Sequence, residues 1–291
     1  MKRWSVVAAC AYVALAGSGW MLELASPNPV PASERQILVF VLVLAAGLLG
    51  RPQWSGLRGS QVWRAAGAGL LLFGLPNLLS PVLEGGLPAF TRVALLALTP
   101  AAVVLVTTSR ESGGFDLLTL LTPSLAGVAG AFLLLPAEPA LLLERPVAAA
   151  AMAATILSIA VGSYAAHAAV ANVPMRVALV LLLAPNVALM AVRAALIHRA
   201  MAMPAVSNVP GVIWGAVEIS LLIYLLQRLP PIVLSGRYFL VPLVTAVEGL
   251  ALVRPAVSVR MVLGAALMGL GAAGLAARGR RGPDSPRSLL G

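Results

Sequence analysis

The fold of this chain is decided by the stretch from Val212 to Ala277, which reads VIWGAVEISLLIYLLQRLPPIVLSGRYFLVPLVTAVEGLALVRPAVSVRMVLGAALMGLGAAGLAA. It holds three apolar runs, separated by the turn Gln227-Arg228-Leu229-Pro230-Pro231 and by Arg254-Pro255. Each run is close to the ~20 residues that a helix needs to cross the hydrocarbon core of a bilayer. Because the connections are short, consecutive helices must run antiparallel. The stretch therefore predicts three packed helices embedded in lipid.

The composition of the whole chain extends this prediction. Of its 291 residues, 60% are hydrophobic and 10% are charged, whereas a soluble domain carries about 25% charged residues. We therefore expect the lipid bilayer to be the solvent of the chain. The formal net charge of +10 does not indicate a nucleic-acid partner, because the basic residues are scattered at helix ends and form no basic face with interleaved aromatics.

The apolar pattern predicts an all-α integral membrane protein with ten membrane spans. The second span is the shortest, and none carries a strong polar stripe. The predicted spans are Trp4–Leu22, Ile37–Gly50, Val62–Leu83, Pro88–Thr108, Phe115–Leu135, Val147–Val170, Arg176–His198, Val209–Leu226, Pro231–Val253 and Ala256–Ala277.

The distribution of Lys and Arg predicts the orientation of these spans. With the N-terminus inside, the inner loops and tails hold most of the basic residues, as the positive-inside rule requires. We therefore expect a multi-pass protein of a plasma membrane, the inner membrane of a bacterium, with both termini cytoplasmic. The polar segment 279–291, rich in Pro, Gly and Arg, is expected to be a disordered cytoplasmic tail.

An internal repeat is visible in the sequence. Leu229-Pro230 repeats Leu87-Pro88 at an offset of 142 positions, and the same offset relates Pro242 to Pro100 and Gly269 to Gly127. We predict two repeats of five helices each, over residues 1–140 and 146–278. Because five is odd, the repeats would insert with opposite orientation, which is a recurring transporter architecture.

The second repeat also resembles a known family. Its Gln227-Arg228-Leu229-Pro230 turn, Pro242 and the closing run from Gly264 to Gly271 are similar to the end of an EamA-type repeat of the drug/metabolite transporter superfamily. The resemblance covers residues 208–277 and, less closely, 62–135. It implies alternating access around a cavity between the repeats, lined by helices one, three, four, six, eight and nine. The expected substrate is a small metabolite such as an amino acid, which the protein would export.

Ionisable side chains inside the spans are the strongest functional signal. Glu218 lies about ten residues from either end of the eighth span, whereas Glu248 and Arg193 lie nearer the outer ends of the ninth and seventh spans. A charge in the bilayer is costly, so such a group usually faces a cavity or a partner. Each is a candidate substrate-binding residue, and Glu218 could instead carry a coupling proton. The structural alternative is an ion pair of Arg193 with Glu218 or Glu248.

Other polar side chains within the spans are weaker candidates. Pro76-Asn77 and Pro185-Asn186 place an amide beside a proline that bends its helix, so Asn77 and Asn186 could contact substrate or bond to their own kinked helices. Trp214 and Tyr164 are the deeper polar-tipped aromatics. They could stack on a substrate or belong to an interfacial belt.

Small residues recur in the fifth and tenth spans, at Gly127, Gly130, Gly264, Gly269, Gly271 and Gly274. They allow close approach of helix backbones, either within the chain or in a homodimer.

The sequence carries no enzymatic motif. It has two histidines and one cysteine, so we expect no metal site, no cofactor and no enzyme activity. Two alternatives stay open: a membrane-embedded enzyme or lipid-carrier protein, and a non-transporting membrane subunit. The enzyme would need clustered His, Asp or Arg at one interface, and here the acids are dispersed.

Overall fold

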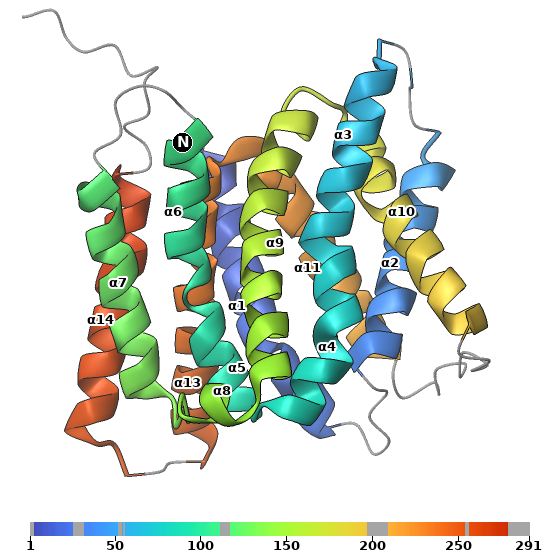
Figure 1. Ribbon diagram of the computed structural model, residues 1–291. Coiled ribbons are helices and arrows are strands. Elements are labelled where there is room, and N and C mark those ends of the chain that lie inside the picture. Colours follow the sequence, from blue (N-terminus) through green and yellow to red (C-terminus); the bar gives the residue numbers. More distant parts are fainter. Residues whose placement is uncertain are drawn as a thin grey trace, which may run out of the picture. The chain divides into compact units, whose positions relative to one another are not determined.

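The computed structural model describes residues 3–25, 32–51, 54, 56–110, 117–196, 209–253 and 256–278. All regular elements in these ranges are helices, which confirms the predicted all-α class (Figure 1). The predicted tail, 279–291, lies outside them.

Eight helical segments are long and apolar enough to cross a membrane, and they coincide with the third to tenth predicted spans. The first two predicted spans fall on α1 (Arg3–Ala25) and α2 (Ala32–Leu49). Their described apolar parts, Trp4–Gly19 and Arg35–Leu49, are shorter, so for these two helices a membrane crossing stays a prediction. The chain has the features of an all-α, multi-pass membrane protein.

The helices group into two compact units. One comprises Met1–Pro81 and Val161–Arg228, and the other comprises Val82–Ala160 and Leu229–Gly291. Each unit therefore takes segments from both predicted repeats.

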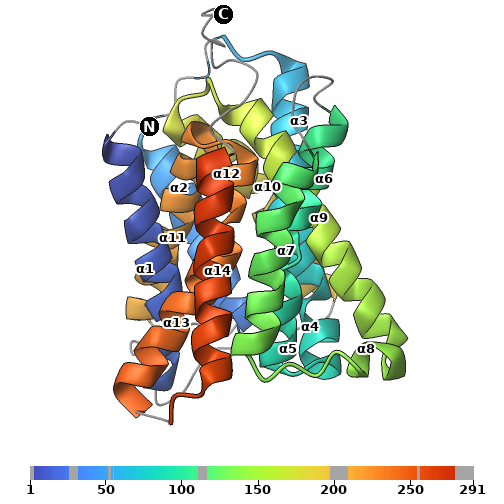
Figure 2. The ribbon, with the colours of Figure 1, turned by 90° about the vertical axis from the view of Figure 1, so that its left-hand side faces the viewer.

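The first unit is built around α11 (Val209–Arg228). α1 and α2 pack against it, and α2 also packs on α10 (Met175–Leu196), as Figures 1 and 2 show. α3 (Gly59–Gly69) contacts α10 and runs through a π-helical turn, Leu70–Gly74, into α4 (Leu75–Gly86). Pro76 is the second residue of α4; it has no N–H to donate and disturbs regular α-helical bonding there.

The second unit is built around the pair α7 (Leu117–Leu134) and α14 (Val259–Arg278), which lie side by side in Figures 1 and 2. Its core includes the buried side chains of Phe239, Met268 and Leu275. The other elements wholly within it are α5 (Ala89–Leu96), α6 (Thr99–Arg110), α8 (Leu141–Glu144), α12 (Pro231–Ser235) and α13 (Arg237–Val253). α9 (Pro146–Val170) contributes its first part to this unit and its last part to the first unit.

Glycines explain how closely α7 and α14 approach. A Cβ atom on Gly130 would lie 2.6 Å from the Gly264 carbonyl oxygen, and one on Gly271 would lie 2.8 Å from the Gly127 Cα. These small residues thus pack within the chain, which is one of the two alternatives that the sequence left open. Gly269 differs, because nothing lies within 4 Å of its Cβ position.

Two predicted spans are interrupted. The fourth divides into α5 and α6 at Ala97-Leu98, and the ninth divides into α12 and α13 at Gly236. Pro100, in the first turn of α6, cannot donate to the Leu96 carbonyl, which accounts for the first break. α5 begins directly after Leu87-Pro88 and α12 directly after Leu229-Pro230, so these starts share the offset of 142 positions seen in the sequence.

Candidate functional site

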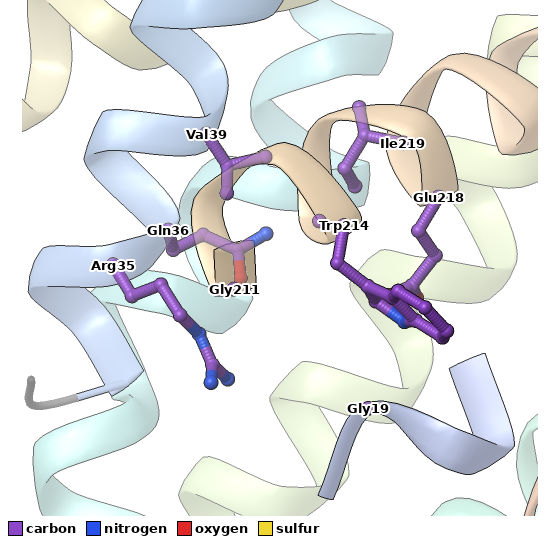
Figure 3. A pocket seen from close by; sticks show the side chains of 9 residues that line it. Gly19, Arg35, Gln36, Val39, Gly211, Trp214, Glu218 and Ile219 are labelled. Atoms are coloured by element: carbon purple, nitrogen blue, oxygen red, sulfur yellow. The ribbon is translucent and has the colours of Figure 1, made fainter. Parts of the chain in front are cut away.

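The candidate site is a pocket on one face of α11. Glu218 is the tenth of the 20 residues of this helix, and Trp214 precedes it by four positions, so both side chains lie on the same face. Figure 3 shows them projecting to the same side of the helix. The pocket has a volume of about 90 Å³ and is lined by Gly19, Arg35, Gln36, Val39, Gly211, Trp214, Gly215, Glu218 and Ile219.

Two glycines of α11 bring α2 to the pocket. A Cβ atom on Gly215 would lie 2.7 Å from Cγ2 of Val39, and one on Gly211 would lie 4.0 Å from Cδ of Arg35. Gly211 and Gly215 are four residues apart, as are Arg35 and Val39, so one stripe of each helix meets the other. Because Gly211 has no side chain, there is room beside it for the aliphatic stem of Arg35.

α1 holds the indole of Trp214. The Nε1 atom of Trp214 donates a hydrogen bond of 2.7 Å to the main-chain carbonyl of Leu15. Gly19 lies one turn later on α1, and a Cβ atom there would be 3.8 Å from Trp214 Nε1. A longer side chain at Gly19 would compete for the space that the indole occupies. The polar atom of Trp214 therefore anchors α1 to α11, and its aromatic ring contributes to the pocket wall.

The pocket combines several kinds of recognition chemistry. It offers the guanidinium of Arg35, the amide of Gln36, the carboxyl of Glu218 and the ring of Trp214. Gly211, which faces Arg35, is seven residues from Glu218, or ~10 Å along the helix axis at ~1.5 Å per residue. The lining therefore extends from the Val209 end of α11 to its middle. Since one water needs only ~10–15 Å³ of such space, the pocket can hold a few waters or one small polar group.

The fold of this chain recurs in a solved structure. That structure, described only as "Crystal structure of protein", superimposes with a TM-score of 0.74 over 97% of this chain and 100% of its own, at 20% sequence identity. At this identity, the similarity establishes the fold and not the activity. No family model and no curated protein matches the sequence.

Of the residues that the sequence singled out, the pocket brings together Glu218 and Trp214. Tyr164 is half-buried on the part of α9 that belongs to the first unit, and Glu248 is half-buried on α13 of the second unit. Neither belongs to the residues that line the pocket.

Arg193 makes a hydrogen bond to the main chain of α4. Its Nη1 atom donates to the main-chain carbonyl of Asn77, at 3.3 Å. The residue one turn after Asn77 is Pro81, which has no N–H to offer this carbonyl. Arg193 on α10 therefore supplies a donor where the proline of α4 removed one.

Asn186 is fully buried and bonds to its own helix. Its Nδ2 atom donates to the Leu182 carbonyl at 2.6 Å, while its Oδ1 atom has no hydrogen-bond partner. A Cβ atom on Gly74 would lie 2.6 Å from that oxygen, so the amide faces the π-helical turn. This geometry matches the structural interpretation of the Pro185-Asn186 pair.

Arg35 and Gln36 are the site residues that sequence reasoning missed. The predicted second span began at Ile37, which placed Arg35 in a loop, whereas α2 begins at Ala32. The available signal was the Gly211-x-x-x-Gly215 spacing, which marks a face of close helix contact. Among the residues that the structure describes, no group of three or more His, Cys, Asp or Glu side chains is arranged to hold a metal ion.

Proposed function

We propose that this chain is a secondary transporter that moves a small metabolite, such as an amino acid, by alternating access. The observation that carries the proposal is Glu218, an acid at the middle of a membrane-length helix, in a pocket that it shares with Arg35 and Trp214. An ionisable residue at that depth normally marks a substrate or ion pathway.

The architecture proposed with this function is that of an EamA-like exporter. It has ten membrane helices in two inverted repeats, 1–140 and 146–278, in a plasma membrane with both termini cytoplasmic. The sequence resemblance supports this family, and the shared offset of the helix starts at Ala89 and Pro231 supports the repeat. Transport would proceed by rocking of helix hairpins, which exposes the central site to each side in turn.

The pocket chemistry favours a zwitterionic substrate. Arg35 suits a carboxylate, Glu218 suits an ammonium group, and Trp214 offers a ring face to either an apolar group or a cation. The alternative role for Glu218 is to carry a coupling proton during transport.

Two other classes of protein compete with this proposal. A membrane-embedded enzyme or lipid-carrier protein would turn over a substrate without moving it across the bilayer. A non-transporting membrane subunit would do neither. Liposomes reconstituted with the purified chain and supplied with a panel of labelled amino acids and related amines separate the three, because only a transporter accumulates or exchanges label inside them.

The decisive variant is Glu218→Gln, which keeps size and hydrogen bonding but removes the charge. If Glu218 binds a substrate ammonium group, loss of a charged hydrogen bond worth about 1.5–3 kcal/mol should reduce exchange tenfold or more. If Glu218 couples protons, pH-driven accumulation should disappear while exchange persists. The matched control is Glu84→Gln, because Glu84 is an exposed acid 3.8 Å from Arg92. Wild-type accumulation and exchange by Glu218→Gln at every pH would eliminate both roles.

A further inference from the structure

A second, quite different concavity lies on the first unit, along α11 from Ile213 to Tyr224. It is an open groove of about 440 Å³ between α2, α11 and the start of α10. The side chains of Leu42, Ile213 and Val217 in its wall are 42%, 53% and 45% exposed. In a multi-pass membrane protein, large aliphatic groups that are this exposed suit a surface that faces lipid.

The groove offers almost no polar atoms to an occupant. Among its lining residues only Ser220 and Tyr224 carry polar side chains. The Ser220 hydroxyl donates to the Ala216 carbonyl of its own helix, at 2.7 Å. The Tyr224 ring lies under the Arg228 guanidinium, with 5.4 Å between Cζ and the ring centroid. The wall therefore suits a hydrocarbon chain, with polar groups gathered at the Tyr224 end.

That end is strongly basic. Arg228 follows Tyr224 by one turn and is exposed, and Arg176 follows the lining residue Met175 and is also exposed. Arg176 reaches the Gly50 carbonyl with Nη1, which holds its side chain across the end of α2. The three chain segments at this end, 46–51, 171–176 and 224–228, contain three arginines and no acid. An anionic group is the complementary partner.

The length of the groove, which extends across the middle of α11, is close to that of one acyl chain. From Ile213 to Tyr224 the lining spans eleven residue steps of α11, or ~16 Å at ~1.5 Å per residue. Half of the ~30 Å hydrocarbon core is ~15 Å. A single acyl chain lying in the groove would therefore place its headgroup at the arginine end.

We propose that this groove is a binding site for an anionic glycerophospholipid, with one acyl chain against α2 and α11 and the phosphate held by Arg176 and Arg228. Basic groups at the cytoplasmic ends of membrane helices recognise anionic lipids in this way, and the positive-inside pattern predicts this end to be cytoplasmic. The site is separate from the Glu218 pocket and does not depend on transport activity.

The test is native mass spectrometry of the purified full chain, titrated with phosphatidylglycerol or phosphatidylcholine of the same acyl chains. The wild type should retain phosphatidylglycerol about tenfold more strongly. Arg228→Gln should remove most of that preference, and Ala216→Phe, which fills the groove, should lower retention of both lipids. The matched controls are Arg110→Gln, an exposed arginine at the end of α6, and Ala266→Phe, an exposed alanine of α14. Both should behave as the wild type.

A second measurement does not depend on how the variants fold. Phosphatidylglycerol with a photoreactive acyl chain should label wild-type peptides from Leu42–Ala46 and Ile213–Tyr224. Equal retention of the two lipids by the wild type would overturn the proposal. Labelling that reaches peptides of α14 as strongly as those of the groove would also overturn it. So would a groove-filling variant that changes the oligomeric state while lipid retention stays the same, because the occupant of the groove would then be a second copy of the chain.

Discussion

At the scale of single residues, the membrane helices show how a backbone defect is repaired by a distant side chain. Pro81 denies a donor to the Asn77 carbonyl, and Arg193, 116 positions later in the chain, donates to it. The sequence shows that each proline leaves a main-chain carbonyl without its usual donor. It does not show which side chain will donate a hydrogen bond to that carbonyl, because this depends on how α4 and α10 pack. For this reason the sequence suggested substrate binding or an ion pair for Arg193, and not a bond to this carbonyl.

A double-mutant cycle tests this repair. Arg193→Met should lower stability by about 1–3 kcal/mol, because a partly buried carbonyl loses its donor. In a Pro81→Ala background a main-chain N–H is restored, so the same Arg193→Met change should cost markedly less. Thermal unfolding of the four proteins in one detergent gives the coupling energy. Equal losses in both backgrounds would show that Arg193 stabilises the protein through some other contact.

At the scale of elements, α11 presents three different stripes of residues to three different neighbours. Gly211 and Gly215 admit α2, Trp214 and Glu218 face the pocket, and Ile213, Val217 and Tyr224 belong to the apolar groove. Helical periodicity alone places Trp214 beside Glu218. It does not reveal Arg35, because the partner stripe lies on another helix whose first turn has the composition of a loop.

The pair α7 and α14 supplies an element-scale prediction with an internal control. Gly271→Ala should destabilise the protein by about 1–3 kcal/mol, because its Cβ would overlap the backbone of α7. Gly269→Ala, two residues earlier on the same helix, meets open space and should be neutral or slightly stabilising, since alanine favours helix over glycine.

Thermal unfolding in detergent compares the two variants directly. A similar loss in both would mean that the close approach of α7 and α14 does not limit stability. A loss confined to Gly269→Ala, with dissociation of an oligomer, would instead indicate that the open side of α14 is an interface.

At the scale of the whole molecule, hydropathy predicted where the membrane-length helices lie. Eight of the ten predicted spans coincide with membrane-length helices, because a long apolar run has few other stable conformations in lipid. The breaks at Ala97-Leu98 and Gly236 were not predicted, since a hydropathy window does not register a short interruption. The sequence also did not reveal which segments make up each of the two compact units, because this depends on contacts between segments far apart in the chain.

The topology of the chain is tested by cysteine labelling. In a Cys10→Ala background, Glu138→Cys should react with a membrane-impermeant maleimide applied to intact cells, and Ser60→Cys should react only after permeabilisation. Both positions are exposed in the structure, so access to reagent depends on the side of the membrane. The reverse labelling pattern would overturn the predicted cytoplasmic location of the termini.

The hydrogen bond to Leu15 fixes the Trp214 indole in the pocket wall, so its fluorescence can serve as an optical probe of the pocket. Indole fluorescence responds to nearby charge and polarity, and Trp214 shares its pocket with Arg35 and Glu218. The chain has five tryptophans, and the other four are Trp4, Trp20, Trp54 and Trp63. A variant that keeps Trp214 and carries phenylalanine at those four positions would have a single tryptophan, so its indole emission would report pocket occupancy in real time without any attached dye.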